Sequence, residues 1–167
     1  MFIGRFPAHL MPLGWAQGPE MEEHRPVKWD GDGGYWVSDD RSLVDAGRVH
    51  LWLSTLSYWA QGRSREVVER SIDESLPLGL YDSGGAQAGF CRWVTDYSTF
   101  AWLADVFVDP AFRGAGLGQF LVRCATDHEA VRDLPLQLLG TRDAHGLYRK
   151  YGFVDVPEPQ RWMERRR

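Results

Sequence analysis

Apolar and polar side chains recur with two spacings along the chain, one typical of helices and one typical of strands. The order of these spacings predicts the secondary-structure elements. Residues 35–38 form a short strand-like run. Two segments with apolar side chains at helical spacing follow, one from Asp45 to Leu53 and one from Ser64 to Leu76. The Asp and the Ser at their starts are suitable N-caps. The first third of the domain is therefore expected to be a strand and two helices.

Three strand-like segments come next, separated by residues that favour tight turns. Residues 78–81, 86–95 and 100–108 are rich in apolar side chains, and the stretches 82–85 and 96–98 have turn composition. Short connections of this kind predict antiparallel pairing. The third segment is nearly all apolar, as expected for a strand at the buried centre of a sheet.

The remaining pattern predicts one parallel crossover. An amphipathic helix begins near residue 117, and residues 134–139 form the next apolar strand. Two strands joined through a helix in this way are parallel. A short helix ended by Gly152 follows, and further strands are expected from Phe153 and over 161–164. The order indicates an α/β fold built on one mixed sheet.

The N-terminal segment differs from the rest of the chain because prolines recur in it and glycines close it. Prolines at such spacing exclude long helices. We expect an irregular arm over residues 1–33, either disordered or laid over the domain, and one folded domain over residues 34–167. Apolar side chains of the arm are candidates for docking on the domain or on a partner subunit: Phe2, Phe6, Leu10, Leu13 and Trp15.

Composition and charge narrow the classes of function. The 167 residues carry a net charge of -4, which gives no support for nucleic acid as the main partner. No segment is long enough to span a membrane, and the N-terminus lacks the apolar stretch of a signal peptide, so we expect a cytoplasmic protein. Cys91 and Cys124 suit neither a disulfide framework nor a metal site, so we expect buried free thiols and no metal.

A glycine-rich turn separates the third strand from the amphipathic helix. Glycines let a backbone approach an anion closely, and the first amides of a helix lack intrahelical partners. The helix dipole and an arginine add positive potential at the same place. The sequence therefore predicts a phosphate-binding turn. Its residues are Arg113, Gly114, Ala115, Gly116, Leu117, Gly118 and Gln119.

Gln119 argues against two common kinds of phosphate-binding turn. A P-loop requires Lys and then Ser or Thr after its last glycine, whereas Gln119 and Phe120 stand there. A dinucleotide-binding turn requires a glycine at the position of Gln119 and follows the first strand of its fold. Here two strands with hairpin connections precede the turn, so a third kind of site has to be considered.

The turn resembles motif A of the GCN5-related N-acetyltransferase (GNAT) family. A second family motif follows at the expected distance, and the predicted order of elements is the family's order. The resemblance implies the GNAT fold, a central mixed and mostly antiparallel sheet with helices on both faces and a β-α-β crossover that carries the acetyl-CoA site. The two motifs read Val106-x-Val108-x-Pro110 with Arg113-x-x-Gly116-x-Gly118, and Ala144-x-x-Leu147-Tyr148-x-x-x-Gly152-Phe153.

The resemblance also implies an activity. Members of the family move an acetyl group from acetyl-CoA to an amine by direct attack through a tetrahedral intermediate. The acceptor is expected to be a primary amine of a small molecule or peptide, and a homodimer is possible. The competing function is a non-catalytic acyl-CoA-binding or sensing module of the same fold.

Two residues match catalytic positions of the family. Tyr148 corresponds to the tyrosine that protonates the departing thiolate, and a phenol stays protonated at neutral pH. Asp105 is the charged residue in an otherwise apolar strand, where many members have a glutamate general base. For Asp105, pairing with Arg92 and binding of a cationic substrate without proton transfer remain open.

The family's cofactor and acceptor contacts fall on further positions. The backbone of Val106, Phe107 and Val108 is expected to pair with the pantetheine arm, and an amide near Val106 to bind the oxyanion. Thr141 stands where many members have Asn, so one cofactor contact is expected to be lost or water-mediated. Residues expected to border an aromatic and acidic pocket for a cationic acceptor are Tyr58, Trp59, Asp96 and Tyr97, with His145 either there or facing solvent.

Overall fold

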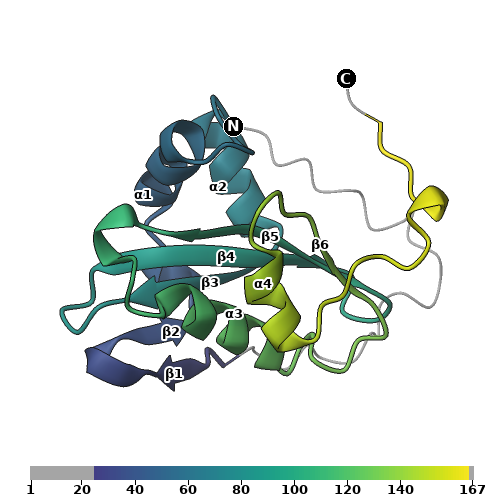
Figure 1. Ribbon diagram of the computed structural model, residues 1–167. Helices are drawn as coiled ribbons and strands as arrows, with labels where there is room; N and C mark the ends of the chain where they lie inside the picture. Colours follow the sequence, from purple (N-terminus) through teal and green to yellow (C-terminus); the bar gives the residue numbers. More distant parts are fainter. Residues whose placement is uncertain (1–24, 166–167) are drawn as a thin grey trace, which may run out of the picture.

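The computed structural model describes residues 25–165, which form one twisted sheet with helices on both faces (Figure 1). The strands are β1 Lys28–Asp30, β2 Trp36–Ser38, β3 Leu76–Tyr81, β4 Gln87–Thr95, β5 Ala101–Val108 and β6 Gln137–Leu139. The helices are α1 Ala46–Leu51, α2 Arg65–Asp73, α3 Leu117–Asp127 and α4 His145–Tyr148, and a π-helical turn, Trp52–Leu56, continues α1.

The six strands lie in the sheet in the order of the chain. Each strand pairs antiparallel with the next, except that β5 and β6 are parallel. The connection between these two strands runs through α3, as a parallel pair requires. The expected fold class, a mixed and mostly antiparallel sheet with a β-α-β crossover, is confirmed.

The helices bury two separate apolar layers against the sheet. On one face, α3 places Leu121 and Ala125 in a cluster with Leu78 and Trp93 of the central strands. On the other face, α1 and α2 pack their apolar side chains around Phe90 of β4. Figure 1 shows α1 and α2 together on one side of the sheet and α3 on the other.

The N-caps expected from the sequence are present. The Asp45 carboxylate accepts the N–H of Arg48 at 2.9 Å, and the Ser64 hydroxyl accepts the N–H of Val67 at 3.4 Å. These bonds satisfy amides that lack partners inside a helix. They fix where α1 and α2 begin, and therefore where the loop between the two helices lies.

The second helix ends earlier than expected. It stops at Asp73, and Leu76 and Pro77 belong to β3, where they pair with Trp93 and Arg92 of β4. Leu76 satisfies helical spacing and strand alternation alike, so its apolar character did not separate the two. Pairing with β4 decides in favour of the strand.

The C-terminal strands expected from Phe153 and over 161–164 are not formed. Within the described residues the chain after η7 (Arg149–Tyr151) is irregular apart from a 3-10 turn over Pro159–Arg161. Pro157 and Pro159 lack the amide donors that a strand ladder needs. The β6 strand is also shorter than the expected 134–139.

The prediction of an irregular arm over residues 1–33 is wrong for residues 28–30, because these residues form β1. Trp29 pairs with Val37 of β2, and the buried Asp39 carboxylate accepts the N–H of Val27 at 2.6 Å. Pairing with β2 thus gives the backbone N–H and C=O groups of this segment hydrogen-bond partners. The proline and glycine content of the segment did not indicate this pairing. Residues 1–24, with the proposed docking side chains Phe2 to Trp15, lie outside the described residues.

Two departures from regular pairing shape the middle of β5. Phe90 pairs with Phe107 and Arg92 pairs with Ala104, so one residue of β4 lies opposite two of β5. Such a β-bulge re-aims side chains. Asp105 lies in this bulge with a φ of 53°, a left-handed conformation that Asp tolerates better than most residues. Its carboxylate consequently lies on the α1/α2 face, beside Arg92.

The parallel pair is short, which leaves part of β5 open. Residues 101–103 of β5 pair with residues 137–139 of β6, and no pairing continues beyond them. From Ala104 to Val108, β5 therefore has no strand partner on its β6 side within the described residues. Backbone N–H and C=O groups along such an edge are available to a ligand.

Candidate active site

A cavity of about 600 Å³ lies where β5 and β6 separate. Its walls come from the loop of residues 58–63, the central parts of β4 and β5, the loop of residues 140–144, and Tyr148 of α4. Segments far apart in the sequence meet here because the sheet order brings them together. A cavity of this size suits a small organic ligand.

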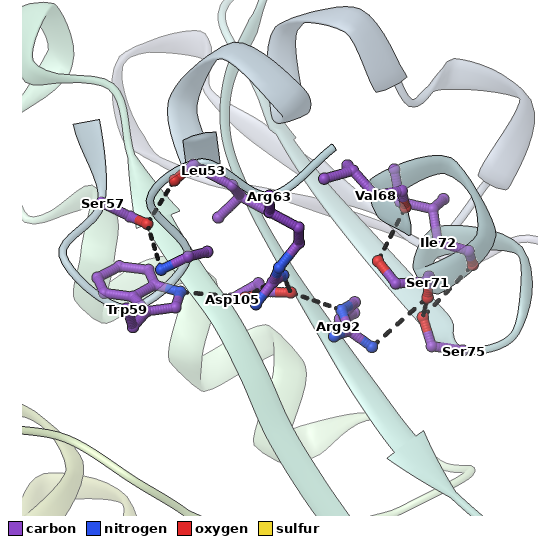
Figure 2. Close-up of polar contacts among 11 residues, drawn as sticks. Leu53, Ser57, Trp59, Arg63, Val68, Ser71, Ile72, Ser75, Arg92 and Asp105 are labelled. Carbon is purple, nitrogen blue, oxygen red and sulfur yellow. Dashed lines mark hydrogen bonds and ion pairs between the residues drawn. The ribbon is translucent and has the colours of Figure 1, made fainter. Parts of the chain in front are cut away.

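The aromatic loop before α2 forms one wall of this cavity. The Ser57 hydroxyl donates to the carbonyl of Leu53 at 2.7 Å and accepts the N–H of Ala60 at 3.1 Å, which fixes the loop (Figure 2). Tyr58 and Trp59 both line the cavity, as expected from the sequence. The loop therefore presents a fixed aromatic surface to a bound ligand.

Asp105 lines the cavity and is the centre of a polar network (Figure 2). Its Oδ1 accepts from Trp59 Nε1 at 3.0 Å and from Arg63 Nη1 at 3.1 Å. Its Oδ2 accepts from the same Arg63 nitrogen at 2.9 Å and from Arg92 Nε at 2.7 Å. The carboxylate side chain is 3% exposed. The pairing with Arg92 is thus present, and a second guanidinium joins it.

These contacts use the carboxylate fully. Each oxygen of an ionised carboxyl group has about two acceptor positions, and each oxygen of Asp105 already accepts two hydrogen bonds. A general base needs a free lone pair within reach of the substrate proton. In this structure Asp105 offers none, so its surroundings differ from those of the expected base.

Tyr148 reaches the same cavity from the opposite wall. Its side chain is almost fully buried, and within residues 25–165 no hydrogen bond occupies its hydroxyl. Burial raises the pKa of Tyr148 to about 12, with smaller contributions from Cys91, Tyr58 and Asp143. The phenol is therefore protonated at neutral pH and free to donate.

The glycine turn lies at the other end of the open β5 edge and forms a second cavity of about 330 Å³. Gly114 and Gly116 have φ values of 90° and 75°, which only glycine adopts without strain. Within the described residues the backbone N–H groups of residues 114–118 have no hydrogen-bond partner. Five unsatisfied donors at a helix start fit a phosphate group.

Hydrogen bonds to the backbone and between side chains hold the side chains beside the turn in place. Arg113 Nε donates to the carbonyl of Val108 at 3.0 Å, which keeps the guanidinium at the turn. The carbonyl of Gln119 accepts from the Tyr151 hydroxyl at 2.8 Å, and its side chain accepts from Lys150 Nζ at 3.2 Å. Arg113 and the free amides are thus the donor set that a pyrophosphate would meet.

Thr141 lies in the loop before the short helix α4, whose N-cap residue is Ala144. Its Oγ1 accepts the N–H of Ala144 at 3.1 Å. This bond closes a turn ahead of α4 rather than capping the helix, and Thr141 also lines the larger cavity. The loss of one cofactor contact, expected because Thr replaces Asn, remains a prediction.

Three expected acceptor-site residues lie elsewhere. Asp96 and Tyr97 belong to the β4–β5 turn, outside the cavity lining. Hydrogen bonds from Thr99, Ser98 and Phe100 hold the pKa of the Asp96 carboxyl well below its usual range. This carboxylate therefore stabilises the β4–β5 turn in which it lies. The exposed His145 lines a smaller neighbouring cavity of about 260 Å³. The acidic residues that line the cavity are therefore Asp105 and Asp143, and not Asp96.

Three arginines also line the cavity. Arg63 and Arg142 line the cavity together with Arg92, and neither was expected from the sequence. The Arg142 guanidinium lies 3.8 Å from the ring centroid of Tyr58, and its backbone N–H donates to the Tyr58 hydroxyl at 3.1 Å. The charge of Asp105 in an apolar strand predicted a cationic partner. It identified Arg92 on the neighbouring strand but did not identify Arg63 in the loop before α2.

The two cysteines take no part in this site. Both are buried free thiols, as expected. Burial raises the pKa of Cys124 to about 12 and raises the pKa of Cys91 further. Thiols that stay protonated in a core are poor nucleophiles.

Comparison with known proteins decides the family. A family model described as an acetyltransferase (GNAT) domain matches residues 77–155. A solved GNAT-family structure from Xanthomonas campestris is 42% identical, covers 79% of this chain and 92% of its own, and superposes with a TM-score of 0.76. The chain belongs to the GNAT acetyltransferase family. The expected family is thus confirmed.

More distant GNAT relatives agree with this assignment. A provisionally named acetyltransferase of Gibberella zeae is 26% identical over 156 residues, covering 80% of this chain and 86% of its own. A Mycobacterium tuberculosis structure in complex with CoA and NLQ is 20% identical, covers 72% of each chain and has a TM-score of 0.58, so it shows the fold. In residues 25–165 of the present GNAT chain, no helix has the length and apolar character needed to cross a membrane.

Proposed function

We propose that this GNAT protein transfers the acetyl group of acetyl-CoA to a primary amine of a small molecule or peptide. The observation that carries the proposal is the continuity of three features along one strand: the free amides of the glycine turn, the open edge of β5, and the cavity with Tyr148. Related folds bind the cosubstrate, since structures from Mycobacterium tuberculosis and Clostridium acetobutylicum contain CoA and acetyl-CoA. The cytoplasmic location expected from the sequence belongs to the same proposal.

The cosubstrate would lie along β5. The N–H groups of residues 114–118 and the Arg113 guanidinium would hold the pyrophosphate, where the α3 dipole adds positive potential. The backbone of residues 106–108 would pair with the amides of the pantetheine arm, as an added strand pairs with a sheet edge. The acetyl group would then enter the larger cavity.

Transfer by direct attack needs a neutral amine, an oxyanion donor and an acid. The amine nitrogen bonds to the acetyl carbon, and the carbon–sulfur bond then breaks. Tyr148 donates its proton to the departing sulfur, since a thiolate is costly in a buried site. A backbone N–H near Val106 stabilises the oxyanion of the intermediate. The nitrogen of the intermediate gives its extra proton to water, and water returns a proton to the Tyr148 phenolate.

We assign Asp105 a positioning role in this scheme. Its oxygens hold the Trp59 indole and the guanidiniums of Arg63 and Arg92 at the cavity wall. Since no acceptor position remains free, the amine proton leaves by another route. This assignment replaces the general-base role that the family resemblance implied.

The test is release of free thiol from acetyl-CoA by the full-length protein in the presence of primary amines. Tyr148→Phe should lower kcat by on the order of a hundredfold, because general acid catalysis contributes about 10²–10⁴-fold. The dissociation constant of acetyl-CoA should stay within about twofold. Because the pKa of Tyr148 is raised to about 12, the wild-type kcat should show no loss of the acid between pH 7 and 9.

Tyr35→Phe is the matched control, since Tyr35 packs on Phe112 outside the larger cavity. It should leave kcat unchanged. Binding of acetyl-CoA without thiol release from any amine would favour the acyl-CoA-binding module instead. Unchanged turnover in Tyr148→Phe would remove this residue from the mechanism.

A further inference from the structure

The charge of the larger cavity is positive, although the whole chain is acidic. Five charged residues line it, and three arginines against two aspartates leave a net charge of +1. Arg142 and Asp143 pair at the rim at 3.3 Å with both side chains about two-thirds exposed, so solvent screens them. The remaining charge belongs to Arg63 and Arg92 around Asp105.

Two guanidiniums on one carboxylate are one more than neutralisation requires. The side chains of Arg63 and Arg92 are only 24% and 13% exposed, so both lose much of their hydration. Keeping an uncompensated cation in such a place costs free energy unless an anion joins it. A ligand anion in the cavity would complete the balance.

Arg63 retains the donors that such an anion needs. Its contacts with Asp105 use Nη1 alone, and within residues 25–165 neither Nε nor Nη2 has a hydrogen-bond partner. The planar guanidinium can present these nitrogens as parallel donors to a carboxylate or phosphate. Asp105 holds Arg63 from one side and leaves the rest of its fork unused.

We infer that the acceptor carries an oxyanion group, a carboxylate or a phosphate, which Arg63 binds beside the amine that is acetylated. This inference rests on the proposed function, and it replaces the cationic acceptor expected from the sequence. An amine that bears only positive charge would meet arginines where it needs carboxylates. An amine with its own anion places that anion on Arg63 and leaves the nitrogen toward Tyr148.

The experiment compares acceptors that differ in the anion alone. The pairs are alanine and alaninamide, lysine and 1,5-diaminopentane, and 2-aminoethyl phosphate and ethanolamine. Binding is measured by calorimetric titration of the full-length protein saturated with CoA, and turnover by thiol release from acetyl-CoA. The anionic member of at least one pair should be favoured by on the order of tenfold to a hundredfold in both Kd and kcat/KM. The favoured pair shows whether carboxylate or phosphate is the anion.

Variants then assign the preference to Arg63. Arg63→Gln should bring the ratio within the favoured pair close to one. Arg63→Lys, which keeps the charge against Asp105 but loses the fork, should lower the ratio and serves if the Gln variant does not fold. Arg65→Gln is the matched control, because Arg65 pairs with Glu69 on the exposed face of α2 and should keep the wild-type ratio.

The outcomes separate the two proposals. Equal binding within every pair, no binding of any anionic member, or a preference that survives in Arg63→Gln would overturn the inference. An anion preference in binding that depends on Arg63, without thiol release from any acceptor, would uphold the anion site at Arg63 and contradict the proposed acetyl transfer.

Discussion

At the scale of single residues, Asp105 shows how a bulge changes the meaning of a buried charge. A charged residue in an apolar strand suggests catalysis when only its position is known. The bulge turns its side chain toward the loop of residues 58–63 and toward Arg92. Three donor groups then occupy both oxygens, and the carboxylate becomes an anchor.

The variant Asp105→Asn distinguishes a positioning role of Asp105 from a role as general base. The amide loses the charge that pairs with Arg63 and Arg92, so the free energy of unfolding should fall by about 3–5 kcal/mol, the range for breaking a buried ion pair. In a domain of this size the Tm should drop by on the order of 10 °C. The acidic limb of the pH profile of kcat/KM should keep its position, because in the proposed scheme Asp105 does not take the amine proton.

Thermal unfolding and rate profiles from pH 5 to 9 provide the measurement. Asp73→Asn is the control, since Asp73 is largely exposed and 3.7 Å from Arg41, and it should change stability by less than about 0.5 kcal/mol. Loss of the acidic limb in Asp105→Asn, with folding retained, would restore the general-base role.

At the scale of elements, the glycine turn requires glycine because of its backbone conformation and not because a side chain would collide with neighbouring atoms. A Cβ added at Gly116 would meet no atom within 4 Å, yet its φ of 75° is left-handed. Side chains at such a φ cost about 1–2 kcal/mol. The turn therefore presents its amides in a geometry that glycine alone supplies without strain.

Gly116→Ala should weaken acetyl-CoA binding more than it slows the chemical step. The strained turn should relax and move the free amides of residues 114–118, so Kd should rise by on the order of tenfold while kcat falls less than threefold. Gly85→Ala is a close control, because Gly85 has a φ of 82° and no neighbour within 4 Å, in the turn before β4. It should carry the same strain and leave Kd unchanged. An equal loss of affinity in both variants would refute a role of the turn in binding.

The elements also show what sequence patterns can and cannot predict. The caps at Asp45 and Ser64 and the parallel crossover follow from local chemistry and periodicity, and the structure confirms them. Arg63 lies in the short aromatic loop before α2, which has no periodicity, so its contact with Asp105, 42 residues away, is set by tertiary packing alone. The bulge depends on the pairing between β4 and β5, and the residue type of Asp105 alone does not predict it.

At the scale of the whole molecule, the proposed cosubstrate would join parts that the sheet leaves apart. The open edge of β5 runs from the bulge to the glycine turn, and β6 with the loop of residues 140–144 lies across the gap. A ligand that pairs with β5 and touches this loop would replace the missing strand contacts. Binding should therefore stabilise the domain as a unit and protect its open edge.

Acetyl-CoA at about 100 times its Kd should raise the free energy of unfolding by about 2.7 kcal/mol, which corresponds to a Tm increase of roughly 5–10 °C. Removal of the ligand by dialysis should reverse the shift. Hydrogen exchange should slow in residues 104–108 and 140–144 as well as at the turn, because the ligand covers both sides of the gap. Acetyl-pantetheine, which lacks the pyrophosphate, should protect the same strand residues at a higher Kd but leave the turn amides unprotected. Protection confined to the turn with acetyl-CoA would contradict binding along β5 and would place the acetyl group outside the cavity that holds Tyr148 and Arg63.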